Sequence, residues 1–198
     1  MMASNLEHTL ADITKSLREQ KRKFALVGGL ALSFRAEVRF TRDVDIAVLV
    51  QDDADFEALI FALRPMGYSV LATVEHTRLK RLATVRLSTP SGPVVDLISA
   101  SCGIEQEIVE RATPIEFGGI SALPVARAEE LLAMKILSMS DRRLQDRIDA
   151  RNLMLYAAEL NLGEVEENLR KITERGFHRD EDLFAKLDAV LRDAKREE

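Results

Sequence analysis

The sequence has only one cysteine, Cys102, and it lacks any long hydrophobic run. A single cysteine excludes an intrachain disulfide framework and a zinc site built from cysteines. The longest apolar run, residues 24–32, is far shorter than the ~20 residues that a membrane-spanning helix needs. The first residues also lack the basic cluster and apolar segment that are typical of a secretory signal. We therefore expect a cytoplasmic protein with no membrane partner.

What the sequence does contain is enough apolar material for a core. The 198 residues are 46% hydrophobic and carry a net charge of −5, which suits one globular domain or a core with a small appendage. Charges of one sign are grouped along the chain, with a net charge of +4 in residues 1–42, −6 in 43–75 and +4 in 76–95. Such blocks are usually solvated faces, but they can also mark a site where anions and metal ions meet.

Hydrophobic spacing predicts strands and helices in the first 125 residues. Leu6, Leu10, Ile13 and Leu17 are spaced as on one face of a helix. Strands are expected at about 24–27, 43–50, 68–74, 82–88 and 94–98, with an extended stretch at 114–125. Further helices are expected at 30–35, 53–64 and 104–111.

The second half is expected to be almost entirely helical, with helices at about 127–139, 142–159, 163–175 and 181–194. This change in composition predicts an α+β fold in two parts. Residues 1–125 would form the sheet domain with flanking helices, and residues 126–198 a C-terminal helical region.

Two glycines and three aspartates are the candidate chemical residues. Gly28 and Gly29 end a strand and open a helix, where backbone N–H groups can approach a phosphate; the alternative is an ordinary tight turn. Asp43 and Asp45 lie two apart on a predicted strand and therefore share a face. Alone, they could be a solvated face of an edge strand. Asp96 lies among apolar residues, where an ionised carboxylate is rarely found without a partner.

Clustered carboxylates predict a metal site, because they raise each other's pKa unless a cation lies between them. Mg²⁺ favours carboxylate oxygens together with substrate phosphates, and two such ions can support an in-line displacement. Asp43, Asp45 and Asp96 are a suitable ligand set for this chemistry.

Longer segments around these residues resemble the DNA polymerase beta-like nucleotidyltransferase superfamily. They are Gly28-Gly29-Leu30-Ala31-Leu32, residues 39–46 and Val95-Asp96-Leu97. Residues 123–124, 130–135 and 145–151 resemble later motifs of the AbiEii/AbiGii nucleotidyltransferase toxins of bacterial toxin–antitoxin and phage-resistance pairs. The resemblance covers about residues 24–155. One difference is Arg35-Ala36, where family members often carry a His-Gly pair.

The resemblance implies a nucleotidyltransferase-like mixed β-sheet domain followed by a C-terminal helical bundle. It also implies transfer of a nucleoside monophosphate from an NTP to a hydroxyl acceptor, with release of pyrophosphate. Asp43 and Asp45 would hold Mg²⁺, and Asp96 would help bind a second Mg²⁺ and act as base on the acceptor. By the same analogy, the nucleotide phosphates would contact Gly28, Gly29 and Lys135, and Asp149 would support the site.

Four features have simpler alternatives. Lys135 could extend along an apolar helix stripe to water, and Asp146 and Asp149 could pair with neighbouring arginines. Arg39 and Arg42 could stabilise charge on a transferring phosphoryl group or be surface residues. The basic block of residues 78–86 could bind a polyanion such as tRNA or cover a solvated strand face.

The sequence thus predicts a Mg²⁺-dependent nucleotidyltransferase that is the toxin of a two-protein system and acts on RNA, with tRNA as the expected acceptor. A winged-helix antitoxin would be its partner. Two alternatives stay open. The enzyme could modify a small molecule, such as an aminoglycoside, or a protein side chain. The fold could also be a catalytically silent binding or antitoxin module, because fold alone does not determine activity.

Overall fold

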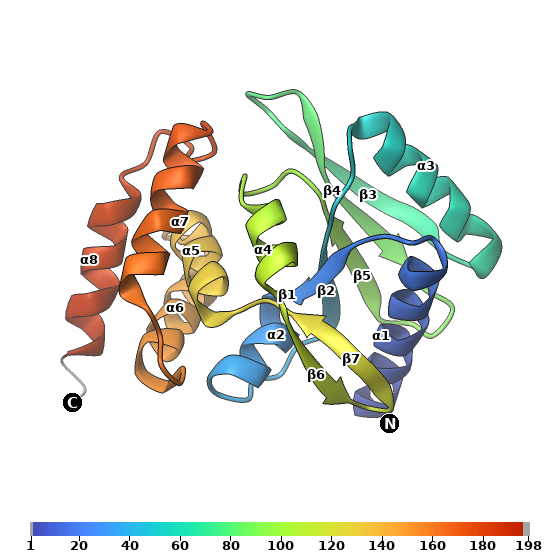
Figure 1. The fold of residues 1–198 in the computed structure, drawn as a ribbon, viewed down its shortest axis with the longest axis horizontal. Helices are drawn as coiled ribbons and strands as arrows, with labels where there is room; N and C mark the ends of the chain where they lie inside the picture. The colour runs from blue at the N-terminus through green and yellow to red at the C-terminus, as the bar shows by residue number, and fades with distance from the viewer. Residues whose placement is uncertain (1, 196–198) are drawn as a thin grey trace.

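The computed structural model describes residues 2–195, which contain a seven-stranded sheet, eight α-helices and one short 3-10 helix, Arg64–Met66 (Figure 1). The strands are β1 (Phe24–Val27), β2 (Asp43–Val48), β3 (Ser69–His76), β4 (Arg81–Ser88), β5 (Val94–Ile98), β6 (Thr113–Phe117) and β7 (Ile120–Val125). The helices are α1 (Met2–Glu19), α2 (Gly28–Arg35), α3 (Asp53–Leu63), α4 (Glu105–Arg111), α5 (Ala128–Ser138), α6 (Leu144–Tyr156), α7 (Leu162–Glu174) and α8 (Leu183–Ala194). The predicted α+β class is confirmed.

The sheet is mixed, with the strand order β3-β4-β5-β2-β1-β7-β6. The pairs β2–β5 and β1–β7 are parallel, and the other neighbours are antiparallel. Strand β2 therefore lies between β1 and β5 in the interior of the sheet. The alternative that Asp43 and Asp45 lie on an edge strand is wrong.

The alternation in β2 divides its side chains between two environments. Val44 and Ile46 are fully buried, whereas Asp43 and Asp45 are only partly buried. Since side chains two apart share a face of the strand, both aspartates point away from the apolar side. The sequence predicted this division from spacing alone.

The stretch 114–125 differs from its predicted single extended segment, because it forms the hairpin β6–β7. Gly118 and Gly119 make the turn with φ of +56° and +78°. Glycine adopts this left-handed conformation without the Cβ clash that other residues meet. The turn therefore reverses the chain and places β7 beside β1, where Leu26 is paired with Val125.

Helices α5–α8 follow the last strand and gather on the left in Figure 1, with α1 and α3 on the right. This group is the predicted C-terminal helical bundle. One continuous cluster of buried apolar residues connects the two sides, from Leu10 in α1 through Ile46 and Leu132 to Leu187 in α8. The boundary predicted at residues 125/126 therefore lies within a shared core.

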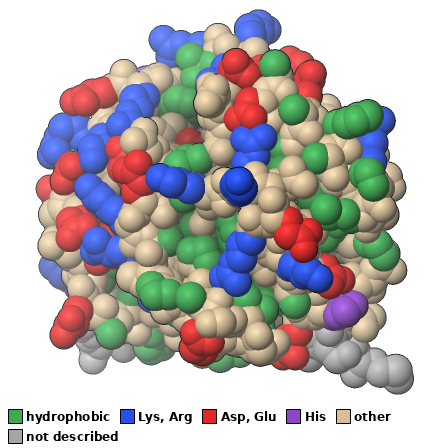
Figure 2. Space-filling model, turned by 45° about the vertical axis from the view of Figure 1, so that its right-hand side comes forward, with side chains coloured by type: hydrophobic (Ala, Val, Ile, Leu, Met, Phe, Trp, Pro, Cys, Tyr) green, Lys and Arg blue, Asp and Glu red, His purple; other side chains and the backbone are tan. Residues whose placement is uncertain are grey.

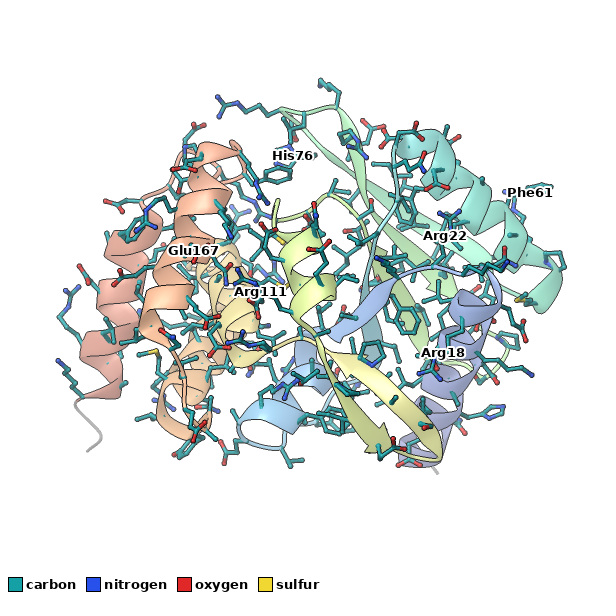
Figure 3. All side chains as sticks on the ribbon, viewed as in Figure 1. Arg18, Arg22, Phe61, His76, Arg111 and Glu167 are labelled. Carbon is teal, nitrogen blue, oxygen red and sulfur yellow. The ribbon has the colours of Figure 1, made fainter. Side chains whose placement is uncertain are left out.

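Arginine side chains connect the helices to each other and to the sheet through ion pairs and hydrogen bonds. Arg111 of α4 lies 3.4 Å from Glu130 of α5 and 3.9 Å from Glu167 of α7 (Figure 3). Arg35, at the end of α2, donates hydrogen bonds to the backbone oxygens of Val125 and Ala126. These contacts give Arg35 a structural role at the junction of sheet and helical bundle.

The charge blocks of the sequence do not form separate patches on the face shown in Figure 2, where basic and acidic side chains are interspersed. Within residues 2–195, no helix combines the length and apolar character required to cross a membrane.

Candidate active site

Two of the candidate carboxylates, Asp45 and Asp96, lie in one row that crosses four neighbouring strands. Asp45 of β2 is paired with Val27 of β1 on one side and with Asp96 of β5 on the other. Asp96 is in turn paired with Arg86 of β4. Residues paired across strands project from the same face of the sheet. Backbone register therefore places Asp45, Asp96 and Arg86 side by side.

The glycine turn directly follows Val27, so it lies against Asp45. Gly28 has a φ of +64°, and a Cβ on it would collide with the Asp45 carboxylate. A Cβ on Gly29 would collide with the Arg39 guanidinium, and it would lie 2.9 Å from Oγ1 of Thr41. The Gly29 N–H donates a hydrogen bond to Asp45. Glycine is thus required at position 28, where the backbone is left-handed and the Asp45 side chain fills the space; at Gly29 the nearest atoms belong to the end of the Arg39 side chain.

Asp45 is a perturbed carboxyl group. Burial, followed by repulsion from Asp96, raises its pKa to about 6; Lys135 and the Gly29 N–H act in the opposite direction. A carboxylate in this state is stabilised by any cation that arrives nearby. The local electrostatics therefore favour a metal ion or another positive group next to Asp45.

Arg86 is the cation already present in the row. Its Nε donates to Oδ1 of Asp96 at 2.9 Å, and its Nη2 donates to Oδ2 at 2.6 Å. The same Nη2 lies 3.4 Å from Oδ2 of Asp43. The buried Asp96 thus has the partner that its apolar surroundings required. In the sequence Arg86 belongs to the basic block of residues 78–86, and its place two residues before the end of a predicted strand is the only local signal for this role.

A second charged group comes from the helical bundle. Nζ of Lys135 in α5 lies 2.7 Å from Oδ1 of Asp146 and 2.7 Å from Oδ2 of Asp149, both in α6. The Lys135 side chain is only 12% exposed, so the alternative that it extends to water is wrong. Nε of Arg39 lies 3.6 Å from Oδ1 of Asp149. Asp149 therefore connects the bundle to the segment before β2.

Asp146 was expected to pair with neighbouring arginines, and the expectation is confirmed in part. Nε of Arg143 lies 2.8 Å from Oδ2 of Asp146, while Lys135 holds Oδ1. Asp146 and Asp149 lie three residues apart and therefore share one helix face. This spacing lets both carboxylates contact the same lysine.

Both groups line one cavity of about 730 Å³ between the sheet and the bundle. The predicted site residues that line it are Gly28, Gly29, Arg39, Asp43, Asp45, Asp96, Lys135 and Asp149. Arg42 instead lines a separate hollow, where its guanidinium carbon lies 5.7 Å from the centre of the Phe40 ring.

A second cavity of about 790 Å³ adjoins the first and shares Ser101, Arg143 and Arg179 with it. It lies beside the β3–β4 hairpin, which carries His76 (Figure 3). The ring centre of His76 lies 4.7 Å from that of Phe177. Arg78 also lines it. The predicted basic block is divided, since Arg78 faces this cavity and Arg86 faces the first.

The donor set fits a magnesium ion that is completed by a substrate. Within residues 2–195, no three acidic, histidine or cysteine side chains converge on one point as a ready-made metal cluster. Mg²⁺, however, is commonly bound by one or two carboxylates together with substrate phosphates and water. Asp43 and Asp45 suit this arrangement, because they share one face of β2 and line the cavity beside the glycine turn.

Solved structures show the same fold. An antigenic nucleotidyltransferase-like protein from Paracoccidioides brasiliensis aligns with a TM-score of 0.52 and 17% identity, covering 97% of this chain and 94% of that chain. The antibiotic-resistance factor ANT(2'')-Ia aligns with a TM-score of 0.51 and 13% identity, covering 97% and 99%. Its complex with adenylyl-2''-tobramycin aligns with a TM-score of 0.52 and 11% identity, covering 86% of this chain and 98% of that chain. The fold is therefore that of the nucleotidyltransferases.

The family follows from the sequence. The model described as "Nucleotidyl transferase AbiEii toxin, Type IV TA system" matches residues 10–197. The chain belongs to this family and is a nucleotidyltransferase. No curated protein matches the chain at a significant level.

Proposed function

We propose that the protein transfers a nucleoside monophosphate from an NTP to a hydroxyl acceptor in a Mg²⁺-dependent reaction that releases pyrophosphate. The observation that carries the proposal is the arrangement of Asp43, Asp45, Asp96 and Lys135 around one cavity beside the glycine turn. The volume of about 730 Å³ lies in the range of small-molecule sites.

Asp43 and Asp45 are the proposed Mg²⁺ ligands. When bound, Mg²⁺ would offset the negative charge of the carboxylates and of the triphosphate. The second ion expected from the sequence depends on Asp96, whose two carboxylate oxygens both accept hydrogen bonds from Arg86.

The remaining proposed residues bind and orient the nucleotide. Gly28 and Gly29 place the start of α2 beside Asp45, where the phosphates would approach the end of the helix. Lys135 and Arg39 supply positive charge to them. Asp149 orients Lys135 through their 2.7 Å contact. Arg42 would reach the nucleotide from its neighbouring hollow.

Asp96 is the proposed base. The acceptor oxygen forms a bond to the α-phosphorus of the NTP while the bond from this phosphorus to the β-phosphate oxygen breaks. The hydroxyl proton passes to Asp96, and pyrophosphate leaves with the electron pair of the broken bond. Placing the hydroxyl beside Asp96 and the NTP beside Asp45 supports an in-line geometry.

RNA is the proposed acceptor, with tRNA as the first candidate. The second cavity is lined by three arginines and two acidic residues: Arg78, Arg143, Arg179, Glu75 and Asp180. The excess of arginine next to the reaction site favours a polyanion. The family supports a toxin whose partner is an antitoxin, and we expect that partner to be a winged-helix protein. An NTP-dependent reaction also suits the expected cytoplasmic location.

Labelling with α-³²P-NTPs tests the proposal. Purified protein, Mg²⁺ and a tRNA pool should give labelled RNA, and Asp45→Asn should abolish the label because it removes the buried metal-binding charge. Asp12→Asn, on the exposed face of α1, is the matched control and should label normally. No Asp45-dependent label on any acceptor would contradict the transferase mechanism.

The same assay separates the other acceptors. ANT(2'')-Ia has been solved with adenylyl-2''-tobramycin, so aminoglycosides form one arm, and a protein fraction forms another. Label that appears on tobramycin or on protein, and not on RNA, would replace the RNA proposal while keeping the transferase chemistry.

A further inference from the structure

Arg86 is held on Asp96 by the architecture of the sheet. The two residues are direct partners in the antiparallel β4–β5 pair, so their side chains emerge next to each other on one face. Two hydrogen bonds of 2.9 and 2.6 Å then join the guanidinium to both carboxylate oxygens. This bidentate geometry is the strongest that an arginine makes with a carboxylate.

The guanidinium also occupies the space between two proposed metal ligands. Its Nη2 lies 2.6 Å from Oδ2 of Asp96 and 3.4 Å from Oδ2 of Asp43. A guanidinium is not deprotonated in proteins, so the charge of Arg86 is permanent. A divalent ion that bridged Asp43 and Asp96 would need this same space and would meet a like charge.

We propose that Arg86 takes the place of a second metal ion, so that the site binds one Mg²⁺ per nucleotide through Asp43 and Asp45. Arg86 is then a positioning residue, because it holds the Asp96 carboxylate in line with the acceptor hydroxyl. This inference rests on the proposed function and replaces the two-ion arrangement expected from the sequence.

Counting bound Mn²⁺ tests the inference without relying on turnover. Equilibrium dialysis with each of the four α,β-methylene NTP analogues, at saturation, should give one nucleotide-dependent Mn²⁺ per wild-type chain. Arg86→Gln removes the charge and keeps most of the length, so its count should rise to two. Arg86→Lys keeps the charge and should stay at one.

Arg81→Gln is the matched control, since Arg81 lies on the same strand and also pairs with an aspartate, Asp53, at 2.8 Å. It should bind one Mn²⁺. Two ions in the wild-type protein, or one in folded Arg86→Gln, would overturn the inference while leaving nucleotide transfer intact. Nucleotide binding with no Mn²⁺ at all would overturn the inference and the proposed function together.

Discussion

At the residue scale, Gly28 shows how one missing side chain shapes the site. Its φ of +64° and its contact with the Asp45 carboxylate leave no unstrained place for a Cβ. Gly28→Ala should therefore lose nucleotide-dependent Mn²⁺ binding and labelling activity, and the left-handed backbone should cost about 1–2 kcal/mol of unfolding free energy. Binding assays and urea unfolding measure the two effects.

Gly119→Ala separates backbone strain from the collision. Gly119 has a φ of +78°, but a Cβ on it meets nothing within 4 Å. This variant should lose a similar amount of stability and keep full activity. Equal losses of activity in both variants would show that strain, and not the contact with Asp45, determines the effect.

Lys135 carries a second prediction at this scale. Its ammonium group lies between Asp146 and Asp149, whose side chains are only 6% and 2% exposed and which also contact Arg143 and Arg39. Lys135→Met should lower the free energy of unfolding by about 3 kcal/mol, because two buried carboxylates would lose their common cation. Urea denaturation measures this change.

Lys171→Met is the control for Lys135. Lys171 pairs with Glu167 at 2.7 Å, and the Glu167 side chain is 46% exposed. Lys171 also lies 3.6 Å from Glu107, which keeps Arg175 as a closer partner at 2.7 Å. Removing a partly exposed pair should cost no more than about 1 kcal/mol. If both lysine variants lost the same stability, burial of the aspartates would not be the source of the effect.

At the element scale, two ion pairs tie the first turn of α3 to its neighbours. Arg81 of β4 hydrogen-bonds to Asp53, and Arg22 hydrogen-bonds to Asp55; Figure 3 shows Arg22 reaching from the end of α1 toward α3. The arginine hydrogen bonds, followed by backbone N–H donors, lower the pKa of both carboxyl groups.

These shifts give the stability a defined pH dependence. A lowered folded-state pKa contributes stability above the unfolded value of about 3.9, and this contribution is lost as pH falls through the folded-state pKa. The double variant Asp53→Asn/Asp55→Asn should therefore lose less stability than the wild type on acidification. Urea unfolding across this pH range measures the difference, and parallel curves for the two proteins would contradict it. Asp12→Asn should follow the wild-type curve.

At the scale of the whole molecule, the continuous core predicts that sheet and bundle unfold together. Buried residues from Leu10 to Leu187 form one cluster, and Arg35 and Arg111 join the two parts at their surface. Calorimetry should show a single transition with equal calorimetric and van't Hoff enthalpies. Two separable transitions would instead support independent domains at 1–125 and 126–198, a division that stays a prediction.

Local patterns in the sequence were sufficient for the elements and for part of the site. The alternation around Val44 and Ile46 predicted strand β2 and the common face of Asp43 and Asp45. The spacing of leucines predicted α1, and the helical second half was recognised from its periodicity. These features depend on neighbours within a few residues, which is the range over which periodicity is informative.

Only the tertiary structure decided which distant residues meet. Strand order made β2 an interior strand, and the β4–β5 register paired Arg86 with Asp96. Packing of α5 on α6 buried Lys135 between two aspartates. Arg42 lines a separate hollow and not the main cavity. The physical reason is that strand register and helix packing depend on many contacts between residues that lie far apart in the sequence. The pattern within one segment does not reveal these contacts. The sequence thus determined which charges the site contains, and the fold determined which of them neutralise one another.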